Sequence, residues 1–348
     1  MTMNNNFLNN LLNSISVSGY EEQVQDIVEE EMKDYVDEVR RDEMQNVTCV
    51  INPNSDIRIM LSAHADEIGL MISNIREDGR LQVIDRGGIV PSTYPGHAIS
   101  IKTSKGIVYG VVEAYRELFK EKDLGTKQFR IDIGAKDRED ALSYVSIGDP
   151  IVLDTTIRKL ANDKFTARAL DDRLGVYIIM EAIKRAKKQG CTVGVYAAST
   201  TGEETTKTGA YWTSTRINPS MAIVVDVTYT SDCSGMDPAE MGTVLLGGGP
   251  VLFNSPIVVK ALNTKMEECA KTAGIQIQRE AASRLSYTDG DKIHFSNQGV
   301  PTVLVSIPLR YMHMPAEVAD EKDVEGFDEF IKQYQKGLAL ERVAIDVM

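Results

Sequence analysis

The run Ile57-Arg58-Ile59-Met60-Leu61-Ser62-Ala63-His64-Ala65-Asp66 determines how the rest of the chain is interpreted. Its first half, 57–61, is short and apolar, which predicts a buried β-strand. The strand leads directly into His64 and Asp66, so an imidazole and a carboxylate are expected at its end. Because ligands of open α/β sheets bind beyond the carboxyl ends of the strands, this run predicts a functional site at that edge.

Further strands and helices follow the same alternation along the chain. A helix is expected after Asp171-Asp172-Arg173-Leu174-Gly175, and another after Ser18-Gly19-Tyr20-Glu21, which has the spacing of a capping box. Three more apolar strands are expected at 193–198, 221–225 and 302–307. Strands that alternate with helices predict an α/β fold with a mainly parallel or mixed sheet flanked by helices on both faces.

The stretch from about Gly69 to about Leu160 has a different texture. It consists of short β-rich runs, such as 81–84 and 107–112, separated by Gly and Pro turns. This pattern predicts a small all-β domain, 69–160, inserted into a catalytic domain formed by 1–68 and 161–348. The chain of 348 residues is long enough for one large core and a smaller inserted one.

Composition narrows the possible partners and the compartment. The formal net charge of −13, with no local Lys/Arg cluster, argues against binding to nucleic acid or to an anionic membrane surface. No apolar run is long enough to span a membrane, and Met1 to Asn13 lacks the layout of a secretory signal. The four cysteines are far apart and include no Cys-x-x-Cys pair, so a cytoplasmic protein with reduced thiols is expected.

Acidic residues and imidazoles follow the predicted strands at the same edge of the sheet. They are His64 and Asp66 after the first strand, Glu203 and Glu204 after the second, Asp226 at the end of the third, His313 beyond the last, and Asp171 and Asp172 at the intervening helix. Buried carboxylates cost several kcal/mol unless something compensates their charge. A metal would do so, and His, Asp and Glu together suit zinc, cobalt or manganese. The set is large enough for two ions bridged by one carboxylate.

Each of these residues has an ordinary structural explanation when it is taken alone. Asp171 and Asp172 could be a charge pair that favours a helix N-terminus, and Glu203 and Glu204 could be a solvated pair. All of these explanations would have to hold at the ends of neighbouring elements, which argues for a common site. By contrast, the two remaining histidines, His97 and His294, lie outside this pattern and are expected to be structural.

The chain resembles the tetrahedral (TET-type) aminopeptidases and the related bacterial glutamyl aminopeptidases over essentially its whole length. The resemblance depends on several motifs that occur in the family's order. They are Ala63-His64-Ala65-Asp66-Glu67-Ile68-Gly69, Ala169-Leu170-Asp171-Asp172-Arg173-Leu174-Gly175, Gly202-Glu203-Glu204, Val225-Asp226-Val227, and Gly299-Val300-Pro301-Thr302 leading to Arg310-Tyr311-Met312-His313.

The resemblance implies a role for each matching residue. His64 and Asp226 would be terminal ligands of one metal ion, Glu204 and His313 would be terminal ligands of a second, and Asp171 would bridge the two. The ions would be zinc or cobalt.

Two further residues have implied catalytic roles. Glu203 matches the general base, and Asp66 matches the carboxylate that orients the His64 ring, a role that its position two residues away also favours. The family's inserted domain is PDZ-like and helps to assemble a hollow tetrahedral dodecamer. This chain departs from the family after the glutamate pair, where it has Thr205-Thr206-Lys207-Thr208-Gly209, and around 113–122 in the insert.

These residues predict a metalloaminopeptidase that acts on peptide substrates. A water held between two metal ions would attack the first peptide carbonyl, while Glu203 takes the water's proton and passes it to the departing amine. One alternative is a glycoside hydrolase, but Glu203 and Glu204 are adjacent and would point in different directions, and that mechanism has no use for the histidines. The other alternative is a metal-binding scaffold without activity, although the presumed base is present.

Overall fold

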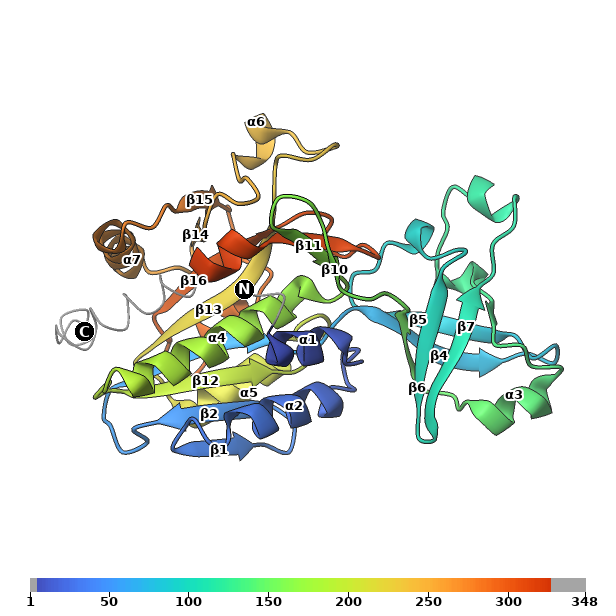
Figure 1. The fold of residues 1–348 in the computed structure, drawn as a ribbon, viewed down its shortest axis with the longest axis horizontal. Helices are drawn as coiled ribbons and strands as arrows, with labels where there is room; N and C mark the ends of the chain where they lie inside the picture. Colours follow the sequence, from blue (N-terminus) through green and yellow to red (C-terminus); the bar gives the residue numbers. More distant parts are fainter. Residues whose placement is uncertain (1–4, 327–348) are drawn as a thin grey trace.

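The larger part of the molecule is built on an eight-stranded sheet (Figure 1). The computed structural model describes residues 5–326. From edge to edge the strands are β1 (Glu38–Arg41), β2 (Val47–Ile51), β12 (Gly194–Thr200), β3 (Arg58–His64), β13 (Met221–Tyr229), β16 (Thr302–Leu309), β14 (Val251–Asn254) and β15 (Gln278–Ala281). The four central strands β12, β3, β13 and β16 run parallel, whereas β1 and β2 pair antiparallel with their neighbours. At the other edge, β14 pairs antiparallel with β16 and parallel with β15. The predicted mixed α/β sheet is therefore confirmed.

Helices cover both faces of this sheet, because its central strands are apolar on both sides. One face packs against α1 (Asn6–Asn13), α2 (Glu22–Met32), α4 (Leu170–Lys188) and α7 (Lys260–Ala273). The opposite face packs against α5 (Thr208–Ile217) and the short α8 (Gly290–Ile293). The one-turn helix α6 (Pro238–Met241) lies outside both layers. The helical repeat of Leu174, Ile178 and Ala182 fits this arrangement, since all three are fully buried in the first layer.

A closed six-stranded barrel extends to one side of the sheet (Figure 1). Its strands are β4 (Gly69–Ile75), β5 (Leu81–Arg86), β8 (Ile131–Asp132), β7 (Gly106–Val112), β6 (Ala98–Thr103) and β9 (Pro150–Leu153). It has its own core, which includes Leu70, Ile99 and Phe129. The barrel also carries the helix α3 (Arg138–Tyr144) and three 3₁₀ turns at 91–93, 118–120 and 126–128. The insert is therefore mainly, but not entirely, β-structure.

A small three-stranded sheet connects the returning chain to the end of the larger part. It contains β10 (Arg158–Lys159), β11 (Lys164–Ala167) and β17 (Glu317–Asp320). Antiparallel pairing of β11 with β17 sets Ala167 opposite Glu317. This register brings the start of α4 beside the segment that follows β16, although about 150 residues separate the two along the chain.

Two local predictions are wrong. Asp226 does not end its strand, because pairing with β16 continues through Tyr229 and Leu309. Ser18 does not cap α2, whose N-cap is Glu21. The Glu21 carboxylate instead accepts hydrogen bonds from the Gly19 and Gly202 N–H groups (2.8 and 3.1 Å). Tertiary contacts with the loop after β12 thus replace the local capping box.

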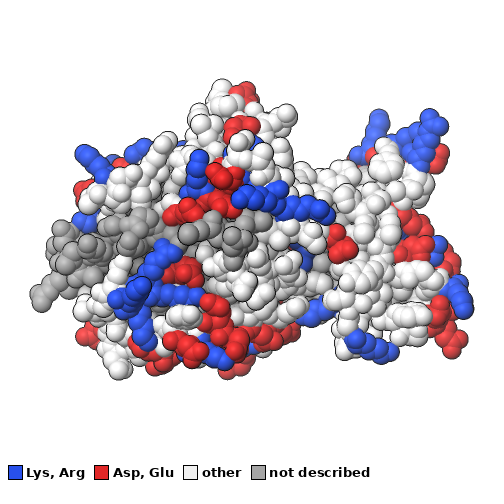
Figure 2. Space-filling view, viewed as in Figure 1, with Lys and Arg blue, Asp and Glu red and all other residues white. Residues whose placement is uncertain are grey.

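The surface charge is mixed on the face that Figure 2 shows. Blue basic side chains are interspersed with red acidic ones, and acidic side chains gather along the lower edge, where α2 and β1 lie in Figure 1. Within residues 5–326, no helix is both long enough and apolar enough to cross a membrane.

Candidate metal centre

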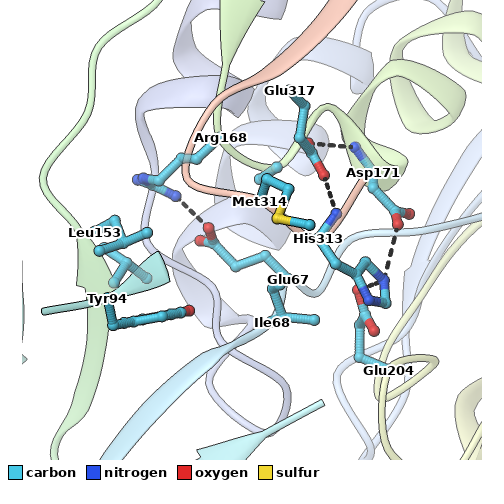
Figure 3. A pocket seen from close by; sticks show the side chains of 12 residues that line it. Glu67, Ile68, Tyr94, Leu153, Arg168, Asp171, Glu204, His313, Met314 and Glu317 are labelled. Carbon is cyan, nitrogen blue, oxygen red and sulfur yellow. Dashed lines mark hydrogen bonds and ion pairs between the residues drawn. The ribbon is translucent and has the colours of Figure 1, made fainter. Parts of the chain in front are cut away.

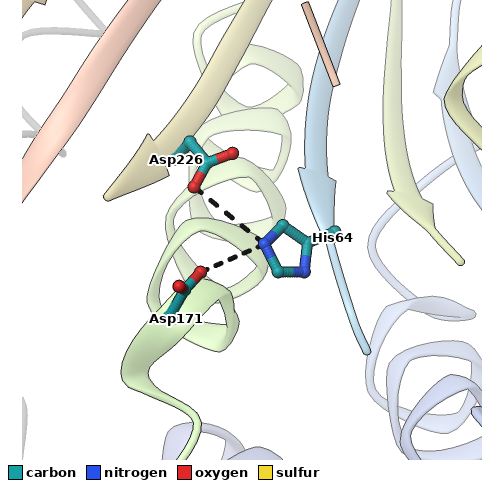
Figure 4. A group of neighbouring side chains, drawn as sticks. All are labelled: His64, Asp171 and Asp226. Atoms are coloured by element: carbon teal, nitrogen blue, oxygen red, sulfur yellow. Dashed lines mark hydrogen bonds and ion pairs between the residues drawn. The ribbon is translucent and has the colours of Figure 1, made fainter. Parts of the chain in front are cut away.

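Three side chains from three different elements meet at the carboxyl end of the central strands (Figure 4). His64 is the last residue of β3, and the β3–β13 register, which pairs Ser62 with Val224, brings Asp226 beside it. The His64 Nε2 atom lies 3.1 Å from Asp171 Oδ1 and 3.9 Å from Asp226 Oδ1. Their potential ligand atoms all lie within 4.8 Å of one another, so this triad could hold one metal ion.

A second triad shares Asp171 with the first. His313 Nε2 lies 3.3 Å from Asp171 Oδ2 and 3.6 Å from Glu204 Oε1. Potential ligand atoms of these three residues also lie within 4.8 Å of one another, and Figure 3 shows the side chains turned toward one another. The two carboxylate oxygens of Asp171 thus face different histidines, which is the arrangement that a bridging ligand requires.

Asp171 is held in position by its backbone as well as by its partners. Asp171 and Asp172 have non-helical dihedral angles, so they form an irregular step at the start of α4 and not a regular first turn. The preceding Ala169 has a φ of 55°, in the left-handed region that non-glycine residues seldom adopt. The Glu317 carboxylate accepts hydrogen bonds from the Leu170 and Asp171 N–H groups (2.8 and 3.3 Å), which anchors this step.

Asp172, in contrast to its neighbour, belongs to neither triad. Its carboxylate accepts hydrogen bonds from the Gly175 N–H inside α4 (3.1 Å) and from the His64 N–H (3.3 Å). Asp172 therefore connects the helix to the end of β3, and the two adjacent aspartates have different surroundings.

His313 is oriented by the barrel and by Glu317. Its Nδ1 lies 2.9 Å from the carbonyl oxygen of Gly88, which can only accept a hydrogen bond, so Nδ1 carries a proton and Nε2 is the ring nitrogen that faces the triad. A Cβ at Gly88 would come within 3.0 Å of that ring. The His313 N–H donates to Glu317 (3.0 Å; Figure 3). His313 itself has a φ of 63°.

Asp66 links the first histidine to the glutamate pair. Its Oδ1 lies 3.5 Å from His64 Nδ1, and its backbone carbonyl lies 3.2 Å from the same atom. Its two carboxylate oxygens also accept the backbone N–H groups of Glu203 (3.0 Å) and Glu204 (3.1 Å). Asp66 therefore fixes the loop after β12 relative to His64.

The Glu203 side chain lies between the first triad and Lys207. Its Oε2 is 3.9 Å from His64 Nε2, while its Oε1 forms an ion pair with the Lys207 ammonium. Burial raises the pKa of Glu203 to about 7, although His64 and Lys207 oppose that shift. A carboxyl group with such a pKa can both accept and release a proton near neutrality.

The electrostatics of the two triads indicate a missing positive charge. Burial, reinforced by nearby carboxylates, raises the pKa of Glu204 and of Asp226 well above their usual range. Burial also acts on Asp171, but hydrogen bonds from His313 and His64 keep its pKa well below the usual range. Two divalent cations would compensate these carboxylates, and the nitrogen and oxygen donor set fits zinc, cobalt or manganese.

The two triads open into a cleft of about 570 Å³. Its lining includes all five residues of the two triads together with Glu203 and Lys207. His97 is exposed in a loop just before β6, and His294 ends α8, so neither takes part. Glu317 and Gly88 have no recognisable pattern in the sequence, because Glu317 accepts backbone N–H groups and Gly88 contacts the His313 ring through its carbonyl oxygen.

Comparisons with known proteins agree on one family. A model of the M42 glutamyl aminopeptidase family matches residues 45–330. The lysyl aminopeptidase of Pyrococcus furiosus is 33% identical over 325 residues, which cover 90% of this chain and 92% of that protein.

Solved structures give the same result. The TET aminopeptidase of a marine sediment archaeon of the Thaumarchaeota has a TM-score of 0.92 at 30% identity and covers 98% of both chains. The TET1 peptidase of Pyrococcus horikoshii, which can assemble into a tetrahedron or a large octahedral shell, has a TM-score of 0.84 at 30% identity and covers 94% of this chain and 97% of its own. A Thermotoga maritima protein named as an endoglucanase has a TM-score of 0.79 at 26% identity and covers 97% of this chain and 99% of its own.

Proposed function

Because the chain belongs to the M42 glutamyl aminopeptidase family, we propose that it is a two-metal aminopeptidase that removes residues from the N-termini of peptides. The observation that carries this proposal is the pair of triads that share Asp171. Two sites connected by one carboxylate are typical of hydrolases in which two ions act on a single water and a single carbonyl.

His64 and Asp226 would hold one ion, Glu204 and His313 would hold the other, and Asp171 would bridge them. The nearest contacts support this division, because Asp171 Oδ1 faces His64 and Asp171 Oδ2 faces His313. When bound, zinc or cobalt would supply the Lewis acidity that activates a water and polarises the scissile carbonyl. Both ions accept these ligands.

The residues of the chain would carry out the proton transfers. Glu203 would accept a proton from the attacking water and donate it to the departing amine, which its raised pKa of about 7 favours. Asp66 would act as a positioning residue, because it contacts the His64 ring and holds the backbone of Glu203. No covalent intermediate with the enzyme is required.

The acidic surroundings would also select the end of the peptide. A free α-ammonium group carries positive charge and would be attracted to the carboxylates around the two triads. An amine held there would leave only the first peptide bond within reach of Glu203. An N-acetylated peptide lacks that charge and would not be positioned.

A glycoside hydrolase is the rival suggested by acidic residues and by the name of the Thermotoga maritima protein. In this chain the adjacent glutamates have different partners, since Glu203 contacts His64 and Lys207 whereas Glu204 contacts His313. A paired acid and base that face one sugar would need neither histidine. An inactive metal-binding scaffold, the second rival, would not need a buried glutamate such as Glu203 beside the triads but outside both of them.

We also propose that the protein forms a homo-oligomer in the cytoplasm, a tetrahedral dodecamer assembled through a PDZ-like barrel. The outward face of β7 supports an interface, because Ile107, Tyr109 and Val111 are all exposed there. The absence of disulfides among the four cysteines fits a reducing compartment. Light scattering of the intact protein would test this part, and a monomer would exclude it.

The central test compares four substrates with the same preparation of protein. The metal-stripped protein is reloaded with zinc or cobalt and assayed on aminoacyl p-nitroanilides, on a peptide, on its N-acetylated form and on a soluble glucan. We expect cleavage of the first two, none of the last two, and no activity before reloading. Glucan cleavage without peptide cleavage would replace the proposal with its rival.

A further inference from the structure

One acidic residue lines the cleft without contacting either triad. Glu280, on the edge strand β15, is the only carboxylate among the lining residues that is not part of the triads or the presumed base. It is partly buried, and its Oε2 accepts a hydrogen bond from the Thr228 hydroxyl (2.6 Å). Among residues 5–326, no Lys, Arg or His lies within ion-pair distance of it. Burial raises the pKa of Glu280, as expected for a carboxylate without a cation.

Glu280 lies at a short distance from the first triad. Thr228, its hydrogen-bond partner, follows Asp226 by two residues on β13, so both side chains point to the same face of the sheet. Two residues of extended strand span about 7 Å. The Glu280 carboxylate, which accepts the Thr228 hydroxyl, therefore lies about one long side chain from Asp226. A substrate whose α-amine is held near Asp226 could reach Glu280 with the tip of its first side chain.

The cleft wall between Glu280 and the first triad is apolar. Phe253 pairs with Glu280 across β14 and β15, and it packs in the same buried cluster as Leu304 of β16. Both side chains line the cleft. Such a wall suits the methylene stem of a long side chain that carries its charge at the tip.

We infer that Glu280 selects substrates whose N-terminal residue is lysine or arginine, by pairing with the positive tip while Phe253 and Leu304 contact the stem. This inference rests on the proposed aminopeptidase function and names its substrate class. It assigns Glu280 to binding of the substrate's first side chain and gives it no part in the chemical step.

The cleft has one basic residue that could favour the opposite preference. Lys207 lines it, but its ammonium group already pairs with Glu203 and donates to the Tyr287 carbonyl (2.9 Å). An acidic substrate side chain would have to compete with the presumed base for that ammonium. Glu280 has no such competitor, since its only described partner is a neutral hydroxyl.

The experiment measures kcat/KM of the zinc- or cobalt-loaded protein for the p-nitroanilides of Lys, Arg, Leu and Glu. We expect Lys and Arg to exceed both Leu and Glu. Glu280→Gln keeps the shape of the side chain, and it should lower the Lys-to-Leu ratio of kcat/KM by about ten- to a hundredfold, mainly through KM. Glu280→Lys should turn the preference toward Glu.

A matched control is Glu267→Gln, which changes a carboxylate of α7 that pairs with Arg279 (2.9 Å) outside the cleft. It should leave the Lys-to-Leu ratio unchanged. A wild-type preference for Leu or Glu would overturn the inference, as would a Glu280→Gln variant that retains the wild-type ratio. Failure of the loaded protein to cleave any of the four substrates would instead count against the proposed aminopeptidase function.

Discussion

Two groups of buried charged residues lie close together in this molecule. The protein neutralises the charge of one group with its own arginines and leaves the charge of the other uncompensated. In one, Glu67 pairs with Arg168 and with Arg173 (2.6 Å) and also accepts the Ser16 N–H (3.1 Å; Figure 3 shows the contact with Arg168). Although burial opposes it, the two arginines keep the pKa of Glu67 below its usual range. In the other group, the carboxylates of Glu204 and Asp226 have raised pKa values.

The difference separates structure from chemistry. Around Glu67 the protein supplies its own counter-charges, which tie the turn after α1 to the start of α4 through Arg173 and the Leu11 and Ser14 carbonyls. Around Asp171 the protein supplies mainly negative charge, and under the proposed function bound metal ions would supply the positive charge. Buried charge is a sign of a functional site when the surrounding protein leaves it uncompensated.

The largest expected effect comes from removing the metal ions that we propose for the two triads around Asp171. A strong chelator should lower aminopeptidase activity by about a thousandfold or more, because metal ions contribute several kcal/mol of transition-state stabilisation. Zinc or cobalt should restore the activity, as measured with a chromogenic substrate. Full activity in a sample shown to be metal-free by elemental analysis would contradict the two-metal proposal.

The next effect separates the two adjacent glutamates. Glu203→Gln cannot accept the water's proton, so it should retain both metal ions and lose activity by about a hundredfold or more. Glu204→Gln should lose metal from one site, and excess zinc or cobalt should recover part of its activity. Metal content per subunit and kcat/KM are measured together.

The outcome for metal content decides the assignment. If Glu203→Gln loses metal while Glu204→Gln retains both ions and is inactive, the two roles are reversed. If both variants remain fully active, the site lies elsewhere in the molecule.

A smaller effect on activity is expected for Asp66, which connects His64 to the backbone of the glutamate pair. Asp66→Asn should lower kcat/KM by about ten- to a hundredfold, because loss of an orienting carboxylate weakens a metal-bound histidine. Asp85→Asn, in the barrel, is the control, since the only described hydrogen bond of the Asp85 carboxylate comes from the Thr126 hydroxyl (3.2 Å). Equal activity of the two variants would contradict the role of Asp66 as a positioning residue.

Substitution of Glu67, which pairs with Arg168 and Arg173, should have the smallest effect on activity and a large effect on stability. Glu67→Gln leaves two buried arginines short of a counter-charge and should lower the free energy of unfolding by about 3–5 kcal/mol. Glu113→Gln breaks the partly exposed pair with Arg80 (2.7 Å) and should cost about 1 kcal/mol or less. Denaturant unfolding of both variants gives the comparison, and equal losses would contradict it.

The contribution of Glu67 should also depend on pH. Its pKa in the folded protein lies below the ordinary value of 4.5, so its stabilisation is fully present above about pH 4.5 and is lost as the pH falls through the lower, folded-state value. The difference in Tm between the wild type and Glu67→Gln should therefore be largest near neutrality and shrink in acid. A difference that grows in acid would reverse this sign.

The sequence predicted the parts of the fold and site that follow from strand periodicity. The sequence predicted that His64, Glu203 and Asp226 lie close together, because apolar runs are recognisable as strands. Ligands bind beyond the carboxyl ends of such strands, at one edge of the sheet. Closure of the insert into a barrel and the true cap of α2 depend on pairings between distant segments, which no local pattern encodes. The sequence pointed to Lys207 only as a departure from the family's motif, and its partner Glu203 lies four residues earlier in the turn that precedes α5.

The contact between the Gly88 carbonyl and His313 has a consequence for assembly. Gly88 belongs to the barrel, whereas His313 belongs to the second triad, so the orientation of this imidazole depends on where the barrel stands. If barrels dock as proposed, a docking that displaces Gly88 would change the affinity of the proposed second ion. By thermodynamic reciprocity, that ion would change the affinity of docking by the same factor. Metal supply and quaternary structure would then be two readouts of one equilibrium.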